Sequence, residues 1–164
     1  MTAEPEQVVA DIEFLLGKLG LEGEEGGASV ESALDEITVL VPAGALRQVL
    51  EAMKDTGFDL FVFVTAVDHP ESDQLRLVYR LGNLGWGAQV FVQADVSRGE
   101  PEVRSVADLW PAADWHEREA MDLLGVTFTG HPNPQTLVLW EGFEGHPLLK
   151  DFEDPTMERR PDYI

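Results

Sequence analysis

Three carboxylates in one short segment, Glu117, Glu119 and Asp122, are the side chains of this sequence best placed to do acid–base chemistry. Two carboxylates can divide the roles of general acid and general base when both face one space. On a helix, however, Glu117 and Glu119 would point roughly 160° apart. Arg118 lies between them and can pair with Asp114 or Asp122 at four-residue spacing. This separation weakens the hypothesis of a small stand-alone hydrolase or isomerase that uses these carboxylates, and it favours a non-catalytic role.

Glu117 is the unusual member of this group, because helical spacing places it between Met121 and Leu124 on the apolar side. A buried carboxylate without a partner is costly or becomes protonated. We expect Glu117 to accept backbone N–H groups from the loops after Gly125, which would tie the following segment to the helix. A catalytic carboxylate and an ion pair across a subunit boundary remain as alternatives.

Metal and cofactor sites find little support in the residue pattern. His116-Glu117 begins a zinc-protease motif, but Ala120 occupies the position of its second histidine. His131 and His146 each precede a proline, at a spacing without a recognised ligand geometry, so we predict hydrogen-bonded loop histidines. The sequence contains no cysteine, which excludes thiolate zinc sites and iron–sulfur ligation by this chain. We expect the chain to bind no cofactor.

Composition indicates one acidic domain. The chain has 164 residues, 44% of them hydrophobic, and a formal net charge of -20. This charge opposes binding to nucleic acid and to anionic lipid head groups, and the acidic surface either aids solubility or complements a basic partner. No window approaches the roughly 18 apolar residues of a membrane-spanning helix, and no basic stretch precedes an apolar run at the N-terminus. We expect a soluble protein inside the cell, without direct membrane insertion.

The first half of the sequence predicts a helix, a strand and a second helix. Apolar residues at helical spacing predict a helix over residues 4–19, and the glycine-rich residues 22–28 predict a flexible connection. Residues 37–41 form a β-branched run that predicts a strand. Helical spacing returns between Leu46 and Gly57.

Three further strands should follow. Residues 58–68 are apolar on both faces, which predicts a central, covered strand. Alternation over residues 75–81 predicts a strand with one wet face, residues 82–87 a hairpin turn rather than a phosphate loop, and residues 90–94 the last strand of an antiparallel meander. This order, β-α-β-β-β followed by helices, predicts an α+β fold with a mostly antiparallel sheet and helices packed on one side.

The C-terminal third predicts helices and then a long extended segment. Ser105 with Asp108 resembles a capping box for a short helix that ends at Pro111, and Asp114 with Glu117 repeats the arrangement for a helix over residues 113–124. Gly125 supplies its left-handed end. We therefore predict a core domain at residues 1–128 and an extended C-terminal docking segment at residues 129–164. Such a segment needs the body of this domain or another chain to pack against.

Two runs of residues are similar to a known family. EREAMDLLGVTFTGHP, residues 117–132, and EGHPLLKDF, residues 144–152, resemble the 30 kDa subunit family of NADH:quinone oxidoreductase (respiratory complex I). The pattern Ala66-Val67-Asp68 also agrees. The positions that fit the family pattern, and that the resemblance implies for partner docking, are Glu117, Arg118, Glu119, Asp122, Gly125, His131, Pro132, Gly145, His146, Pro147, Lys150, Asp151 and Phe152. Gln135 and Leu149 stand where the family usually has arginine, so the docking contacts of those arginines are not expected here.

The resemblance implies a non-catalytic peripheral-arm subunit of a proton-translocating enzyme that transfers electrons from NADH to quinone. Its partners would be the large quinone-site subunit and the adjacent iron–sulfur subunit, at the cytoplasmic face of the cell membrane. NAD, FMN and the iron–sulfur clusters would belong to other subunits. The equivalent module of a membrane-bound hydrogenase or formate-hydrogen-lyase complex is an alternative, since such assemblies use a similar domain.

Overall fold

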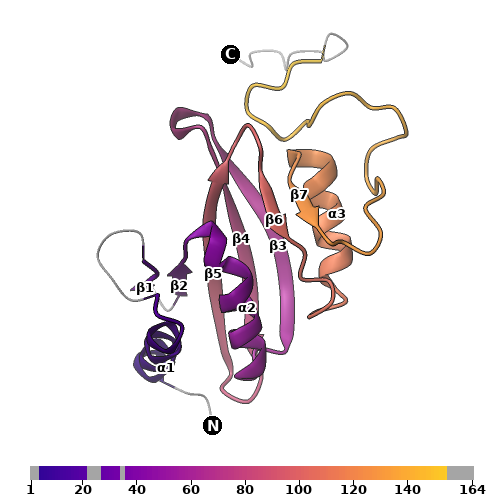
Figure 1. Ribbon diagram of the computed structural model, residues 1–164. Coiled ribbons are helices and arrows are strands. Elements are labelled where there is room, and N and C mark those ends of the chain that lie inside the picture. The colour runs from indigo at the N-terminus through magenta and orange to yellow at the C-terminus, as the bar shows by residue number, and fades with distance from the viewer. Residues whose placement is uncertain (1–3, 22–26, 34–35, 155–164) are drawn as a thin grey trace, which may run out of the picture.

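A five-stranded mixed sheet is the centre of the computed structural model, which describes residues 4–21, 27–33 and 36–154 (Figure 1). The strands lie in the order β1-β2-β5-β4-β3. Their bounds are β1 Ser29–Ala33, β2 Glu36–Leu40, β3 Leu60–His69, β4 Gln74–Asn83 and β5 Ala88–Ser97. All neighbouring strands are antiparallel except β2 and β5. The predicted α+β class with a mostly antiparallel sheet is confirmed.

The one parallel pairing within this described sheet follows from the path of the chain. After β2, the short 3-10 helix η1 (Ala43–Ala45) and helix α2 (Leu46–Asp55) carry the chain over the sheet to β3 at its far edge. The 3-10 turn η2 (Pro70–Ser72) leads into the hairpin of β4 and β5, which fills the space between β2 and β3. The predicted turn of this hairpin is confirmed, with Asn83 paired to Ala88.

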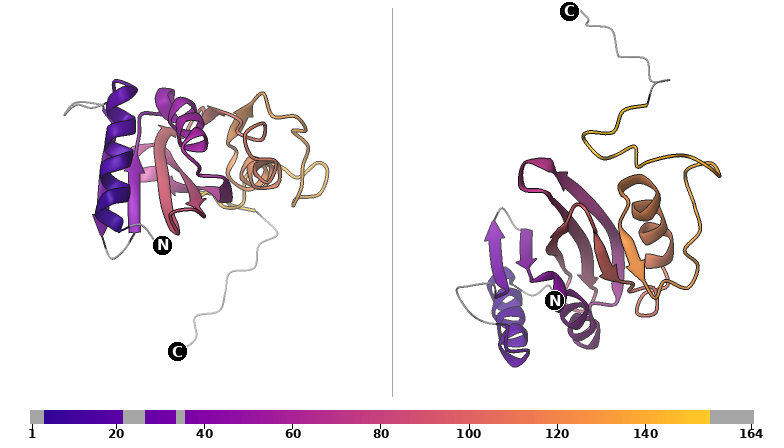
Figure 2. Two further views of the ribbon diagram at one scale, coloured as in Figure 1. Left: turned by 90° about the horizontal axis from the view of Figure 1, so that it is seen from below. Right: turned by 45° about the horizontal axis from the view of Figure 1, so that its top comes forward.

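Helices cover one face of the sheet (Figure 2). Helix α1 (Pro5–Lys18) buries Val8, Ile12 and Leu16, and α2 buries Leu46, Val49, Leu50 and Met53. Alternate residues of β4 belong to the same hydrophobic core as these helix residues, and four of them, Leu75, Leu77, Tyr79 and Leu81, are fully buried. This alternation is the half-wet strand that the sequence predicts.

The prediction that residues 58–68 form a central strand is wrong, because β3 is an edge strand. The apolar residues on both faces of β3 are explained by a β-bulge and by a helix that packs on the strand. A β-bulge between Phe61 and Phe63 changes the phase of the strand, and helix α3 (Ala113–Leu124) packs against it. Phe61 lies 5.8 Å, centroid to centroid, from the rings of both Trp110 and His116.

The short helix predicted over residues 105–111 is absent, and a turn stands in its place. Asp108 does not cap a helix because its carboxylate accepts hydrogen bonds from Arg47 of α2, at 2.6 and 2.7 Å. Helix α3 likewise has no side-chain cap at its N-terminus, since Glu117 points inward. Strands β6 (Glu102–Arg104) and β7 (Thr127–Thr129) flank α3 as a small parallel sheet, which the sequence pattern did not predict, and β1 was also missed.

Beyond β7, residues 130–154, called the tail below, contain no helix or strand and return along α3 (Figure 1). The connection predicted at residues 22–28 and the end of the docking segment, residues 155–164, fall largely outside the described residues.

Replacing Gly125, the left-handed end of α3, should destabilise the protein more than replacing a similar glycine elsewhere. Gly125 has φ +76, and a Cβ there would lie 2.6 Å from His146 Cδ2, whereas Gly130 has φ +77 and no described atom within 4 Å. We expect Gly130→Ala to lower the free energy of unfolding by about 1 kcal/mol through backbone strain. Gly125→Ala should lower it by about 2 kcal/mol or more, because the tail must also move. Urea denaturation measures both values, and equal losses would show that the tail does not pack on Gly125.

Candidate functional site

Helix α3 places the three candidate carboxylates in three different surroundings. Glu117 is 0% exposed and Asp122 is 8% exposed, whereas Glu119 lies in solvent. The helix therefore directs Glu117 toward the body of the domain and Asp122 toward the tail. These two buried carboxylates define the candidate site.

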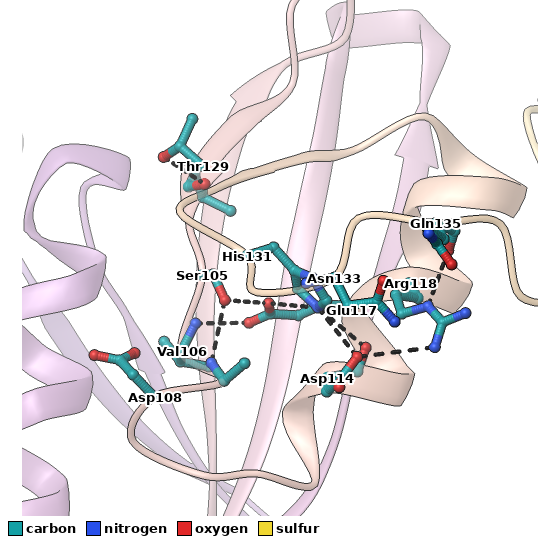
Figure 3. Close-up of polar contacts among 12 residues, drawn as sticks. Ser105, Val106, Asp108, Asp114, Glu117, Arg118, Thr129, His131, Asn133 and Gln135 are labelled. Carbon is teal, nitrogen blue, oxygen red and sulfur yellow. Dashed lines mark hydrogen bonds and ion pairs between the residues drawn. The ribbon is translucent and has the colours of Figure 1, made fainter.

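Glu117 is held by the loop that leaves β6 (Figure 3). Ser105 Oγ donates to Glu117 Oε2 at 2.6 Å, and the Val106 N–H donates to Oε1 at 2.7 Å. The expectation that loops after Gly125 would supply these donors is therefore wrong. The helix face that carries Glu117 packs against residues 105–107, which precede α3 in the chain. Both oxygens are satisfied, so the carboxylate joins α3 to β6.

Burial raises the pKa of Glu117 to about 7, although the hydrogen bonds from Ser105 and Val106 favour the ionised form. Asp108 raises this pKa further, and Arg47 lowers it slightly. The carboxyl group thus changes its charge near neutral pH.

His131 is the link between this buried carboxylate and the tail. Its Nε2 atom lies 3.7 Å from Glu117 Oε2 and 3.3 Å from the carbonyl oxygen of Asp114. Its Nδ1 atom accepts the N–H of Asn133 at 3.0 Å, so the neutral ring carries its proton on Nε2. The predicted role of His131 as a hydrogen-bonded loop histidine is confirmed.

Asp122 performs the task that the sequence pattern assigned to Glu117. A single oxygen, Oδ2, accepts the N–H groups of Leu137, Val138 and Leu139 at 2.6, 2.8 and 3.3 Å. Burial opposes ionisation, yet these three N–H groups hold the pKa of Asp122 below its usual value. The tail is therefore tied to α3 by an ionised carboxylate.

Arg118 completes this attachment one turn earlier on α3. Its guanidinium donates to the carbonyl oxygens of Gln135 and Thr136, at 2.9 and 3.0 Å. It also lies 4.0 Å from Asp114, so one of the two predicted carboxylate pairs is present. Arg118 and Asp122 thus bind successive peptide groups of the tail, one through carbonyl oxygens and the other through N–H groups.

The second half of the tail is held at two further points. The carbonyl oxygen of Asp122 accepts a hydrogen bond from His146 Nδ1 at 2.8 Å, and the Leu148 N–H donates to the Leu123 carbonyl oxygen at 2.9 Å. Farther on, Phe152 packs so closely on Gly145 that a Cβ there would lie 2.8 Å from the ring. Both His146 and Phe152, two of the family-motif residues, therefore shape the path of the tail.

Asp68, the last residue of the Ala66-Val67-Asp68 pattern, is a site residue to which the sequence pattern assigned no role. It is 3% exposed, and it accepts hydrogen bonds from Arg98 Nε at 2.7 Å and from the Lys150 N–H at 2.8 Å. The Arg98 guanidinium holds the pKa of Asp68 below its usual value, and it also pairs with Asp151. Residues far apart in the chain therefore meet here, which no local spacing could reveal.

The remaining family-motif positions lie at the surface or partly buried. Pro132 is exposed, Pro147 is half-buried and the Lys150 side chain is exposed. At the two departures from the family pattern, Gln135 contributes its carbonyl oxygen to Arg118, and Leu149 packs against the core.

The geometry does not favour a stand-alone hydrolase. Glu117 and Asp122 face different partners and Glu119 faces solvent, so no two of these carboxylates converge on one space. Ser105, Glu117 and His131 are residue types of a nucleophilic triad, but Ser105 Oγ donates to the carboxylate instead of the histidine, and all three are buried.

Two kinds of feature are absent from the described ranges, residues 4–21, 27–33 and 36–154. No cluster of three or more histidine, cysteine, aspartate or glutamate side chains there is arranged to hold a metal ion. No helix in these ranges has both the length and the apolar character needed to cross a membrane.

Sequence comparison relates the chain to one family. The family model described as "Respiratory-chain NADH dehydrogenase, 30 Kd subunit" matches residues 39–158. Over 124 residues the chain is 40% identical to an NADH-quinone oxidoreductase subunit of Moorella thermoacetica, and the match covers 75% of this chain and 84% of that relative. The corresponding subunits of a Methylobacterium species and of Rhodopseudomonas palustris are longer, and the match covers 59% to 61% of their length.

Two solved structures are similar to this one. A chain of the membrane-bound sulfane sulfur reductase, an archaeal respiratory membrane complex, superposes with a TM-score of 0.77 at 26% identity, covering 94% of this chain and 98% of that one. The trypsin-resistant fragment of Nqo5 gives a TM-score of 0.64 at 27% identity, covering 78% of this chain and 97% of that one.

The raised pKa of Glu117 predicts a pH-dependent stability that Glu117→Gln removes. The pKa rises from 4.5 to about 7 on folding, so the folded state binds the proton more tightly. Stability from this group is present below pH 4.5 and is lost as the pH rises through 7. We expect the stability difference, variant minus wild type, to increase by roughly 3 kcal/mol over this range. Glu119→Gln, on the exposed side of α3, is the control for net charge, and a pH-independent difference for Glu117→Gln would refute the assignment.

Asp122→Asn should loosen one short part of the tail. Hydrogen bonds to an ionised acceptor are about twice as strong as neutral ones, so the amides of residues 137–139 should exchange with solvent roughly tenfold faster or more. Hydrogen exchange followed by NMR measures this. The Leu148 amide, which donates to Leu123, is an internal control and should change little. Unchanged exchange at residues 137–139 would mean that Asp122 does not hold the tail.

Proposed function

The chain belongs to the respiratory-chain NADH dehydrogenase 30 Kd subunit family, and we propose that it serves in such an NADH:quinone oxidoreductase as a non-catalytic docking subunit. Its partners are the large quinone-site subunit and the adjacent iron–sulfur subunit. NAD, FMN and the iron–sulfur clusters belong to other subunits, and the assembly lies at the cytoplasmic face of the cell membrane.

The observation that carries this proposal is the surface of the tail. Val138, Trp140 and Leu148 are 55%, 69% and 56% exposed, although each lies in a segment fixed to α3. Large apolar side chains on a fixed, exposed backbone are typical of a protein interface. We call these three residues the tail patch.

Trp140 has the features of an interface anchor. Its ring contacts Phe143 edge-on at 4.7 Å between centroids, and Phe143 stacks on Phe152 at 5.9 Å. These contacts fix the ring before a partner binds, which lowers the entropy lost on association. Beside it lies a hollow of about 180 Å³, lined in part by Met121 and Thr136, that has room for one apolar side chain of a partner.

The buried carboxylates support docking by fixing the backbone rather than by touching a partner. Glu117 and Asp122 are both committed to donors of this chain, and Arg118 binds carbonyl oxygens of the tail. The family-motif residues thus give the tail its shape, and the tail patch gives it the apolar surface.

A second candidate function is a place in a related membrane-bound complex. The TM-score of 0.77 with a chain of the sulfane sulfur reductase complex favours it, and the hydrogenase-type modules form the same class of alternative. The partner recovered with the tagged chain distinguishes the candidates. Preparations that reduce quinone with NADH support the first function, and a nickel-containing large subunit supports a hydrogenase-type assembly.

Recovery of partner subunits should depend on the tail patch. Leu148→Asp places a charge on it, and Leu84→Asp makes the same change in the β4–β5 turn, where Leu84 is 77% exposed. With tagged chains expressed in the native host and purified in mild detergent, we expect Leu148→Asp to recover about tenfold less large subunit than wild type, corresponding to about 1.4 kcal/mol. Leu84→Asp should behave as wild type.

Two outcomes would contradict the docking proposal. A wild-type chain recovered only as monomer would count against docking altogether, and equal recovery with both aspartate variants would exclude the tail patch. Turnover by the purified chain that disappears in folded Glu117→Gln would overturn the non-catalytic role.

A further inference from the structure

The face of the sheet opposite the helices has no described element over it (Figure 2). Among the residues of this open face, Leu60 and Val67 of β3 are 38% and 42% exposed. Leu60 lies against Gly82 of β4, where an added Cβ would be 3.1 Å from Leu60 Cδ2. The face is therefore partly apolar, in contrast to the acidic surface expected from the composition.

The strand register places one cation between two aromatic rings on this face. Phe63 of β3 pairs with Arg80 of β4, and Arg80 pairs with Phe91 of β5. The Arg80 guanidinium lies 5.0 Å from the centre of the Phe91 ring, and the two phenylalanine rings are 6.4 Å apart. Val78 lies on the same face, two residues along the strand.

Arg80 differs from the neighbouring arginine in having no acceptor. Arg76, on the same face, donates twice to Asp95 at 2.7 Å, which neutralises both groups. Arg80 has no hydrogen bond or ion pair to any described residue, and its Nε atom is buried without a partner. The contact with the Phe91 ring compensates only part of the hydration that the half-buried guanidinium loses, and no anion among the described residues supplies the rest. The missing group is a hydrogen-bond acceptor of negative charge.

We propose that the open face, centred on Arg80 between Phe63 and Phe91, binds an apolar segment of a neighbouring subunit that carries one aspartate or glutamate. The carboxylate pairs with the guanidinium, and the apolar flanks of the segment cover the two rings and Val78. The proposal rests on the proposed function, since the neighbour is a subunit of the same complex, and it adds a second contact surface separate from the tail.

A protein carboxylate fits this face better than other anions. Phosphate backbones and anionic lipid surfaces are recognised by several cations together, whereas Arg76 on this face is already neutralised by Asp95. The net charge of -20 also opposes the approach of polyanions. In an apolar segment with a single carboxylate, the carboxylate matches the charge of the one guanidinium and the apolar residues match the two rings.

Charge reversal at Arg80 tests the proposal in the assembled complex. We expect tagged Arg80→Glu to recover about tenfold less of one neighbouring subunit than wild type. Arg104→Glu, an exposed arginine of β6, makes the same charge change elsewhere and should leave recovery unchanged. Thermal unfolding of the isolated variants shows whether both are folded. Wild-type recovery with Arg80→Glu would overturn this inference alone, whereas failure of the wild-type chain to recover partners would overturn the proposed function.

A second variant identifies the anion without disturbing the charge. Arg80→Lys keeps a cation beside Phe91 and adds a primary amine, which a water-soluble carbodiimide joins to a carboxylate in direct contact. In the complex assembled with this variant, we expect mass spectrometry to find residue 80 linked to an aspartate or glutamate of another subunit. A link only to carboxylates of this chain, or no link at all, would overturn the proposal.

Discussion

The desolvation of two carboxylates on one helix determines how the chain is arranged after the sheet. A carboxylate removed from water must find donors, and backbone N–H groups are the donors that a nearby irregular segment can offer. Glu117 takes its donors from the loop before α3, and Asp122 takes them from the tail after it. Helix α3 therefore joins two irregular segments, which would otherwise have no regular structure to pair with.

The two buried carboxyl groups differ in how readily they ionise. Three N–H groups converge on Asp122 and keep it ionised, whereas Glu117 has two donors and deeper burial, and its pKa rises to about 7. Asp122 therefore binds the tail as a carboxylate at neutral pH, whereas burial opposes the ionisation of Glu117 and its hydrogen bonds from Ser105 and Val106 favour it. His131, near the start of the tail, contacts both Glu117 and the backbone of Asp114.

Local sequence patterns correctly predicted the elements that are determined by residues close together in the chain. The alternation in β4, the helical spacing in α2 and the left-handed end of α3 at Gly125 all depend on residues close in the chain. The helix predicted over residues 105–111 does not form, because the carboxylate of Asp108 pairs with Arg47, which lies 61 residues before Asp108 in the chain. The donors of Glu117 and the role of Asp68 were missed for the same reason, since their partners are set by the packing of α3 and the return of the tail. Most residues of the candidate site could be named from sequence, but not their partners.

The few cations of this acidic chain are used to join segments that are distant in sequence. Arg47 joins α2 to the turn before α3, Arg98 joins β3 to the tail, and Arg118 joins α3 to the tail. Because these guanidiniums are neutralised or bonded within the fold, they add little attraction for an external anion. Recognition of a partner must then depend mainly on exposed apolar side chains whose positions those internal bonds fix. Arg80 is an exception, because no carboxylate in the part of the chain that the structure describes neutralises its charge. A partner that offers one matching carboxylate at this position would therefore bind better than a partner that lacks it.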